Sequence, residues 1–164
     1  MGKTLTAELL LMKCKTDKLG NIKNLNLWGN DLEDISIIKD MPNIETCSLS
    51  LNKIISLKAF TSCKKLTELF LRKNLVTDLL EIKYLTYCPS LRVLWLWDNP
   101  IADHPLYRTY IIKMLPNLVK LDNANVTAEE RADASKVNIS EQDIINNLPA
   151  NNPAQVSINT MLYY

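Results

Sequence analysis

The sequence predicts an α/β solenoid in which short parallel strands stack along one side and helical turns along the other. Three observations support this prediction: a recurring 11-residue segment, an asparagine at one position of every copy, and a nearly constant period. Asn30, Asn52, Asn74 and Asn99 are spaced by 22, 22 and 25 residues. Internal periods of this length are typical of solenoids, in which each unit covers the core of the next.

The copies begin at residues 22, 44, 66 and 91, and they fit the leucine-rich repeat pattern L-x-x-L-x-L-x-x-N-x-L. They read I-K-N-L-N-L-W-G-N-D-L, I-E-T-C-S-L-S-L-N-K-I, L-T-E-L-F-L-R-K-N-L-V and L-R-V-L-W-L-W-D-N-P-I. A partial fifth copy, L-V-K-L-D-N, begins at Leu118. We therefore expect a leucine-rich repeat domain over residues 1–135. Residues 136–164, where the period is lost and asparagine and proline accumulate, should form a tail.

Within each copy the segment L-x-L alternates apolar and variable residues, as in a short strand with one face turned inward. Because the copies stack in register, the leucine positions should form two buried ladders. The variable positions should line the opposite, concave side of the arc. The first ladder comprises Leu25, Cys47, Leu69, Leu94 and Leu121, and the second comprises Leu27, Leu49, Leu71 and Leu96.

The repeated asparagine follows the strand at the point where the backbone turns. Its amide combines donors and acceptors, so we expect it to bond free peptide groups of its own turn and of the neighbouring turn. An apolar residue there would leave buried peptide groups unpaired, at about 1–3 kcal/mol each.

Three of the four cysteines occupy apolar columns of the repeat. Cys47 stands at a leucine position of the strand. Cys63 and Cys88 stand three residues before a copy, where leucine or methionine stands in the other repeats. Because no C-x-x-C pair occurs and the single histidine is distant in sequence, we interpret these cysteines as reduced core residues rather than metal ligands.

The N-terminal end of a solenoid needs a cap, because its first unit has no neighbour. Residues 4–16 read as a capping helix, with Leu5, Leu9 and Met12 at helical spacing. The same end begins M-G-K-T-L-T, which fits the myristoylation pattern M-G-x-x-x-[ST] at Gly2. A single acyl chain would give only marginal membrane binding.

The C-terminal end shows its own cap signals. Asp103 or His104 should cap a helix that has Pro105 in its first turn, carries apolar residues from Leu106 to Met114 and stops before Pro116. Further on, T-A-E-E from Thr127 is a capping box that opens another short helix. One turn of helix after Ser140 is the only regular element expected in the tail.

Composition narrows the class of function. The formal net charge is +1, from 19 basic and 18 acidic residues, so no long-range field attracts nucleic acid or an anionic membrane. The apolar run from Leu9 to Met12 near the N-terminus is far shorter than a membrane span and lacks the cleavage site of a signal peptide. We expect a cytoplasmic monomer that binds no nucleic acid and does not insert in a membrane.

Catalysis has no support in the sequence. His104 is the only histidine, and neither a G-x-S-x-G nor an H-E-x-x-H motif occurs. The run from Gly2 to Thr4 imitates the end of a phosphate loop but lacks its upstream glycine and strand. We therefore predict that the protein is not an enzyme and binds no cofactor or metal.

The variable strand positions in the C-terminal half are rich in aromatic residues and cations. Phe70 should neighbour Trp95 in one column, and Arg72 should neighbour Trp97 in the next. Exposed aromatic and arginine side chains are typical of binding hot spots, and we expect Trp97 and Arg72 to be exposed in the free protein. Alternatively, the tail covers them, or they only pack on one another. The candidate protein-binding residues are Trp28, Phe70, Arg72, Arg92, Trp95 and Trp97.

Several runs go beyond the generic repeat. They are D-I-S-I (34–37), M-P-N-I-E (41–45), E-L-F-L-R-K-N (68–74), L-R-V-L-W-L (91–96), L-P-N-L-V-K-L-D-N (115–123) and V-T-A-E-E (126–130). Taken in this order, over roughly residues 5–135, the sequence resembles the family of cilia- and flagella-associated protein 410.

This resemblance implies a cilium, flagellum or basal-body protein that works by binding other proteins. The family usually adds a C-terminal helical module for oligomerisation and partner binding, for example of a NIMA-like kinase. The chain stops at Tyr164, so we expect that module to be missing or reduced. Other interpretations of the repeats are a regulatory subunit of a protein phosphatase, or a structural subunit of a dynein or ribonucleoprotein complex.

Overall fold

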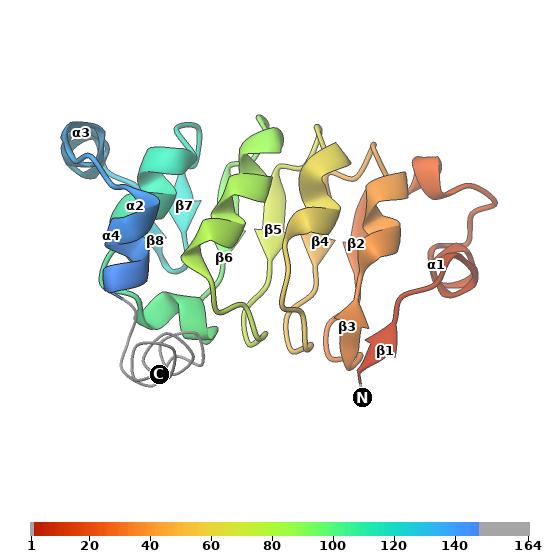
Figure 1. Cartoon of the computed structure of the whole chain (residues 1–164). Coiled ribbons are helices and arrows are strands. Elements are labelled where there is room, and N and C mark those ends of the chain that lie inside the picture. Colours follow the sequence, from red (N-terminus) through yellow and green to blue (C-terminus); the bar gives the residue numbers. More distant parts are fainter. Residues whose placement is uncertain (1, 148–164) are drawn as a thin grey trace, which may run out of the picture.

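Six short strands form one sheet along the length of the molecule, in the order β2-β4-β5-β6-β7-β8 (Figure 1). In the computed structural model, which describes residues 2–147, the first five strands are parallel and β8 is antiparallel to β7. This arrangement confirms the predicted leucine-rich repeat solenoid. The strands are β2 (Asn24–Asn26), β4 (Thr46–Ser48), β5 (Glu68–Phe70), β6 (Val93–Trp95), β7 (Lys120–Leu121) and β8 (Ala124–Asn125).

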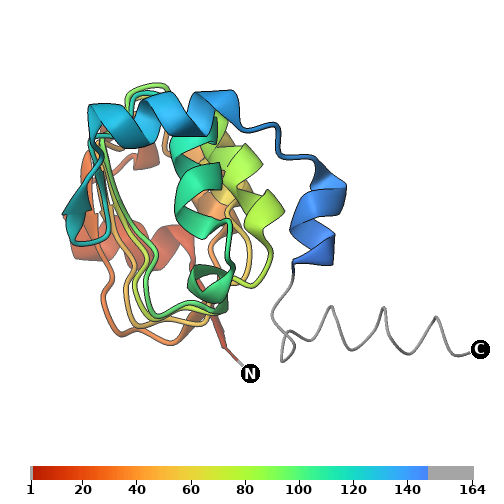
Figure 2. The same cartoon turned by 90° about the vertical axis from the view of Figure 1, so that its left-hand side faces the viewer.

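The opposite side of the solenoid consists of 3-10 helices and one α-helix (Figure 2). The repeat with the longer period absorbs its extra residues here, because η4 is 9 residues long whereas η2 and η3 are 5. The sheet register is unaffected, since Glu68 still pairs with Val93. The elements are η1 (Leu19–Asn21), η2 (Ser36–Asp40), η3 (Lys58–Ser62), η4 (Leu79–Tyr87), η5 (Pro100–Asp103) and α2 (Tyr107–Met114).

The core lies between these two sides and contains both predicted ladders. Leu25 is 2% exposed, and the other eight ladder residues are fully buried. Cys63 and Cys88 fill the column before each strand, as predicted, and their thiols contact the carbonyl oxygens of Ile38 and Phe60. The three cysteines of the apolar columns are therefore core residues.

The asparagine ladder makes the bonds expected of it in the inner repeats. The Asn74 amide nitrogen donates to the carbonyl of Leu71 in its own repeat and to that of Leu49 in the preceding repeat, at 2.9 and 3.0 Å. Its oxygen accepts from the Ile54 N–H at 3.0 Å. Asn30 differs, because it belongs to the first repeat, and among residues 2–147 its amide bonds only the nearby carbonyl of Trp28.

The N-terminal cap is helix α1 (Ala7–Cys14), which begins at the side chain of Thr6 and lies within the predicted range. A two-residue strand, β1 (Lys3–Thr4), precedes it and pairs with β3 (Leu32–Asp34). The expected inner face of α1 is wrong in one respect. Leu10 is fully buried, whereas Met12 is 71% exposed, because only a short stretch of the helix rests on the first repeat.

The C-terminal cap begins with α2 and α3 (Ala128–Lys136), and the capping box predicted at Thr127 is present. The cap continues into the expected tail as α4 (Glu141–Asn146), which starts at Ser140 and lies beside η4 (Figure 2). Ile144 of α4 is 1% exposed, so this first part of the expected tail contributes to the core. The rest of that tail lies outside the described residues.

His104 links the two halves of this cap. Its Nδ1 accepts from the Leu106 N–H at 3.0 Å, just before α2, and its Nε2 lies 2.9 Å from the Ile144 carbonyl. The predicted cap by Asp103 or His104 is wrong, because α2 has Leu106 at its N-cap and no side-chain bond caps it; His104 instead bonds the backbone just before the helix. Among the described residues, no helix is long and apolar enough to cross a membrane.

Candidate functional site

The strand face, meaning the side of the sheet opposite the leucine ladders, presents two columns of variable residues. Strand pairing places Asn26, Ser48, Phe70 and Trp95 in one column. Backbone bonds between neighbouring repeats place Trp28, Ser50, Arg72 and Trp97 in the next. Both predicted neighbour relations, Phe70 with Trp95 and Arg72 with Trp97, are present.

Phe70 and Trp95 pack edge to face across adjacent strands. Their ring centroids are 5.5 Å apart and their planes differ by 77°. This is a favoured aromatic geometry, because the positive edge of one ring meets the negative face of the other. Both side chains are half-buried, so the pair remains partly open to a partner.

Arg72 lies flat against the indole of Trp97, with its guanidinium carbon 3.8 Å from the ring centroid. Asp98 holds the guanidinium there, because its Oδ2 accepts from Arg72 Nε at 3.0 Å. Asp98 has φ +59°, and the residue directly before the repeated asparagine has a positive φ in each earlier copy as well. The expected open exposure of Trp97 and Arg72 is wrong. Trp97 is half-buried and the Arg72 side chain is 33% exposed, because each covers the other.

Asp122, which follows β7, holds the backbone of the chain just after β6. Its Oδ1 accepts from the N–H groups of Leu96 and Trp97, at 2.8 and 3.0 Å. Its Oδ2 accepts from the Tyr107 hydroxyl at 2.9 Å, and burial together with this carboxylate raises the pKa of Tyr107. The backbone that presents Trp97 is therefore fixed by a side chain of the C-terminal cap.

Two of the six candidate residues lie outside this group. Trp28 is 60% exposed and is separated from Arg72 by the small Ser50 of the intervening strand. Arg92 lies before its strand, where its Nη1 donates to the Asn117 carbonyl at 3.0 Å. We call the remaining residues, together with Asp98, the strand-face cluster: Phe70, Arg72, Trp95, Trp97 and Asp98.

Sequence reasoning missed the supporting acidic residues of this site. Asp98 directly follows Trp97, and its role depends on a left-handed backbone conformation that the repeat pattern alone does not reveal. In the partial fifth copy, Asn123 replaces the second leucine of L-x-L, and this break beside Asp122 was the available signal. A polar residue at a buried leucine position indicates that the strand is not completed.

His104, Cys63 and Cys88 are each held in a structural contact. Among residues 2–147, no group of three or more histidine, cysteine, aspartate or glutamate side chains could hold a metal ion. Burial raises the pKa of Cys63 to about 11 and that of Cys88 to about 12, so neither thiol is a nucleophile near neutral pH. His104 engages both ring nitrogens in bonds to the backbone.

The fold and the repeat columns define a leucine-rich repeat protein. Residues 10–146 match the family described as leucine-rich repeat, which covers most of the chain, and the chain belongs to this family.

Within that family, the chain is similar to cilia- and flagella-associated protein 410 of Mus musculus. The two are 44% identical over 128 residues, which make up 77% of this chain and 51% of that protein. The chain thus spans about half the length of this relative. It is also 37% identical over 115 residues to leucine-rich repeat-containing protein 23 of Bos taurus, covering 70% of this chain and 34% of that protein.

A solved structure supports the fold. The crystal structure of the Drosophila melanogaster SNF/U2A' complex contains a chain that matches with a TM-score of 0.70 and 21% identity. The match covers 87% of this chain and 79% of that one. At this identity the likeness concerns the fold alone.

Proposed function

We propose that the protein is a non-catalytic interaction module that binds a protein partner through the strand-face cluster, within a cilium- or flagellum-associated assembly. The observation behind this proposal is the Arg72–Trp97 stack beside the Phe70–Trp95 pair. Tryptophan, tyrosine and arginine dominate the residues that contribute most to binding at protein interfaces.

The cluster is ordered before any partner arrives. Asp98 restrains Arg72, and Asp122 fixes the backbone of Trp97. A side chain that is already held in place loses little conformational freedom on binding, and this lowers the entropic cost of association. Preorganisation of this kind favours recognition of one partner geometry.

The cluster also contains two hydrogen-bond donors that have no acceptor within the described residues. The indole N–H groups of Trp95 and Trp97 are buried, and neither meets an acceptor within the described residues. An unpaired buried donor costs about 1–3 kcal/mol. The two tryptophans therefore carry a cost in the free protein that a smaller apolar residue would avoid, and this supports a role in binding.

Similarity to cilia- and flagella-associated protein 410 supports the cellular setting of the proposal. A ciliary scaffold needs surfaces that hold other proteins and requires no chemistry. The partner in this proposal is accordingly a ciliary or basal-body protein, with a kinase or phosphatase subunit as a further member of the same assembly.

Affinity purification of the tagged full chain from ciliated cells, followed by mass spectrometry, tests the proposal. Trp97→Ala should remove the specific partners, because the stack is the centre of the surface. Tyr87→Ala is the matched control, since Tyr87 is an aromatic residue of η4 that is 54% exposed on the other side of the solenoid.

Loss of ciliary or basal-body partners from Trp97→Ala but not from Tyr87→Ala supports the proposal. Equal recovery with both variants contradicts the strand-face cluster as the binding surface. Recovery of phosphatase, dynein or ribonucleoprotein subunits as the main partners contradicts the ciliary assignment and favours one of the other interpretations.

A further inference from the structure

The edge of β2 that faces away from β4 is open. In a parallel pair, alternate residues direct their N–H and C=O groups to the same neighbour. Lys23 and Leu27 bond to β4, at 3.0 and 2.9 Å, so Asn24 and Asn26 direct their peptide groups to the other side. Within residues 2–147, these peptide groups have no hydrogen-bond partner. In Figure 1, β2 is the end strand of the sheet.

The matching carbonyl groups of the later strands are all bonded. Each accepts from the residue after the preceding strand, so the open edge is a property of the first repeat alone. The donors and acceptors are Leu27 N to Ser48 O at 2.9 Å, Leu49 N to Phe70 O at 2.8 Å, and Leu71 N to Trp95 O at 2.8 Å.

The open edge has a defined length. It ends at Trp28, whose N–H donates to the side-chain oxygen of Asn26 at 3.1 Å and whose carbonyl accepts from the side chain of Asn30 at 2.8 Å. The free groups therefore belong to β2 itself, which is 3 residues long like its neighbours β4, β5 and β6. An added strand of the same length would fill the edge.

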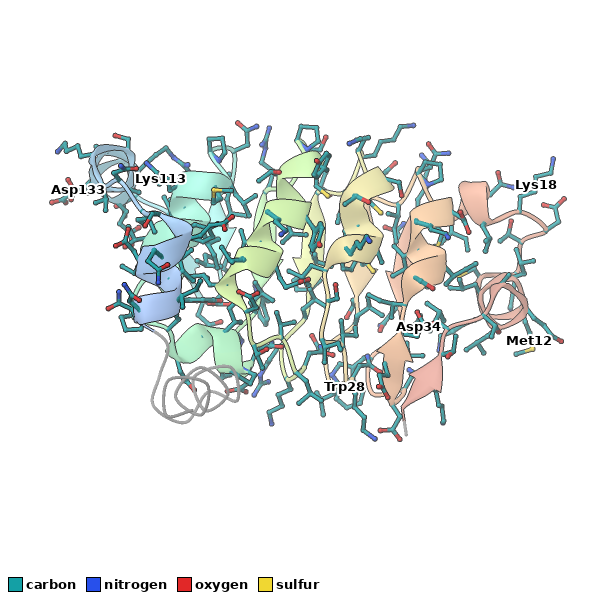
Figure 3. The ribbon with its side chains drawn as sticks, viewed as in Figure 1. Met12, Lys18, Trp28, Asp34, Lys113 and Asp133 are labelled. Carbon is teal, nitrogen blue, oxygen red and sulfur yellow. The ribbon has the colours of Figure 1, made fainter. Side chains whose placement is uncertain are left out.

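Trp28 lacks the cover that Trp97 has. Arg72 belongs to the strand before Trp97, occupies the same column, and stacks on the indole. In the described sheet no strand lies on the outer side of β2, and Trp28 is 60% exposed, whereas Trp97 is half-buried. Figure 3 labels Trp28 near the lower rim of the solenoid, far from the C-terminal cap that carries Asp133. A strand on the open edge would supply the missing neighbour.

We propose that an extended segment of a partner protein adds to β2 as a further parallel strand and places an arginine over Trp28. Its backbone would bond the free groups of Asn24 and Asn26, as one strand adds to an exposed sheet edge in other complexes. The arginine would repeat the relation of Arg72 to Trp97. This edge is separate from the strand-face cluster, and the inference does not rest on the proposed function.

A second copy of the chain fits the edge less well. Two β2 strands related by a two-fold axis would pair antiparallel, with Asn24 of one opposite Asn26 of the other. That register sets Trp28 opposite Ile22, which is 4% exposed and faces its own core. Self-pairing would satisfy the backbone groups and leave Trp28 uncovered.

The probe is a fluorescent peptide with the sequence of residues 66–73, L-T-E-L-F-L-R-K, which carries Arg72 in the required register. It is titrated with the full chain and followed by fluorescence anisotropy. In the added strand, the peptide's copies of Leu69 and Leu71 direct their N–H groups to β2. N-methylation of both should weaken binding by at least about tenfold, because two backbone hydrogen bonds are lost. The N–H of the peptide's copy of Phe70 points away from β2, so its N-methylation should have little effect on binding.

Two changes in the protein provide the matching test. Asn24→Pro removes an N–H that bonds nothing in the free chain and obstructs the edge, while Asn24→Ala keeps that N–H. Binding should be lost in the first and kept in the second, with equal melting temperatures. Trp28→Ala should weaken binding of the peptide by about tenfold or more. It should also abolish the difference in affinity between this peptide and one with alanine in place of its Arg72.

Three results would overturn the proposal. One is absence of peptide binding, and another is equal binding by the two N-methylated peptides. The third is a dimer of the free chain in light scattering that Asn24→Pro converts to a monomer, since a second copy would then occupy the edge. Should Asn24→Pro fail to fold, the pair of N-methylated peptides still decides the outcome.

Discussion

The Arg72 guanidinium stacks on the indole of Trp97 and at the same time forms an ion pair with Asp98. Arg72→Ala should uncover Trp97, shift its fluorescence to longer wavelength and increase its quenching by acrylamide. Stability should fall by less than about 1 kcal/mol, because both groups are partly exposed. Lys73→Ala, at the exposed neighbouring position, is the control and should leave the fluorescence unchanged.

Leu94→Ala removes a fully buried member of the first leucine ladder. The variant should lose about 2–5 kcal/mol of unfolding free energy, from lost transfer energy and the cavity left behind. Denaturant unfolding measures the change. Val93→Ala, at the neighbouring half-buried strand position, is the control. A loss below about 0.5 kcal/mol at Leu94 would show that the core is assembled in a different register.

Asn74→Leu keeps the approximate size of a buried side chain but removes its three bonds to Leu49, Leu71 and Ile54. The peptide groups left behind are buried, at a cost of about 1–3 kcal/mol each. Asn30→Leu should cost much less, because Asn30 only bonds the carbonyl of Trp28. Thermal melting of the two variants, side by side, checks the difference. Equal losses would contradict the bridging role of the inner asparagines.

The thiols of Cys47, Cys63 and Cys88 should react slowly with a maleimide until the protein unfolds. Each is buried, and desolvation raises the pKa of each, to about 11 for Cys63 and about 12 for Cys88. Cys14, at the end of α1, is half-buried and should react first. Mass spectrometry of the labelled native chain distinguishes them. Rapid modification of all four would contradict the core assignment.

Glu130 links the capping box of α3 to Arg108 of α2, at 2.9 Å between Oε2 and the guanidinium Nη2. Arg108 and the Thr127 N–H lower the pKa of Glu130 from 4.5 to about 2. Because the folded-state pKa is the lower one, the charged form stabilises the fold above about 4.5, and this contribution is lost as the pH falls towards about 2.

The matched variant for this prediction is Glu130→Gln, which keeps a capping-box side chain without the charge. Its melting temperature should lie below that of the unmodified protein at neutral pH, and the two should converge as the pH falls towards 2. A constant difference across this range would contradict the charge contribution of the Arg108–Glu130 pair.

The repeat columns were predictable from the sequence because every copy must bury the same strand positions and bond the same turn. Nine ladder positions and the asparagines follow from alternation and period alone, and the pairing of Phe70 with Trp95 follows from the register. The capping box at Thr127 was equally readable, because its partners are three residues apart.

Features that depend on contacts between distant segments could not be read in this way. The helical spacing of α1 did not indicate which face rests on the first repeat, so Leu10 is buried while Met12 is exposed. The docking of α4 depends on His104 meeting the Ile144 carbonyl, 40 residues later in the chain. The cover of Trp97 depends on Arg72 meeting Asp98, 26 residues later in the chain, and the repeat pattern does not specify that contact.

The bridging asparagines also give the solenoid a direction. Each inner asparagine ties the turn of its own repeat to the turn before it, so local opening of one repeat releases bonds in its N-terminal neighbour. Asn30 has no such bond to make, and the strand beside it has a bare edge. Fluctuations should therefore begin at this end and pass inward, repeat by repeat. Amide hydrogens of the first repeat would exchange with solvent long before those around Leu69 and Leu94.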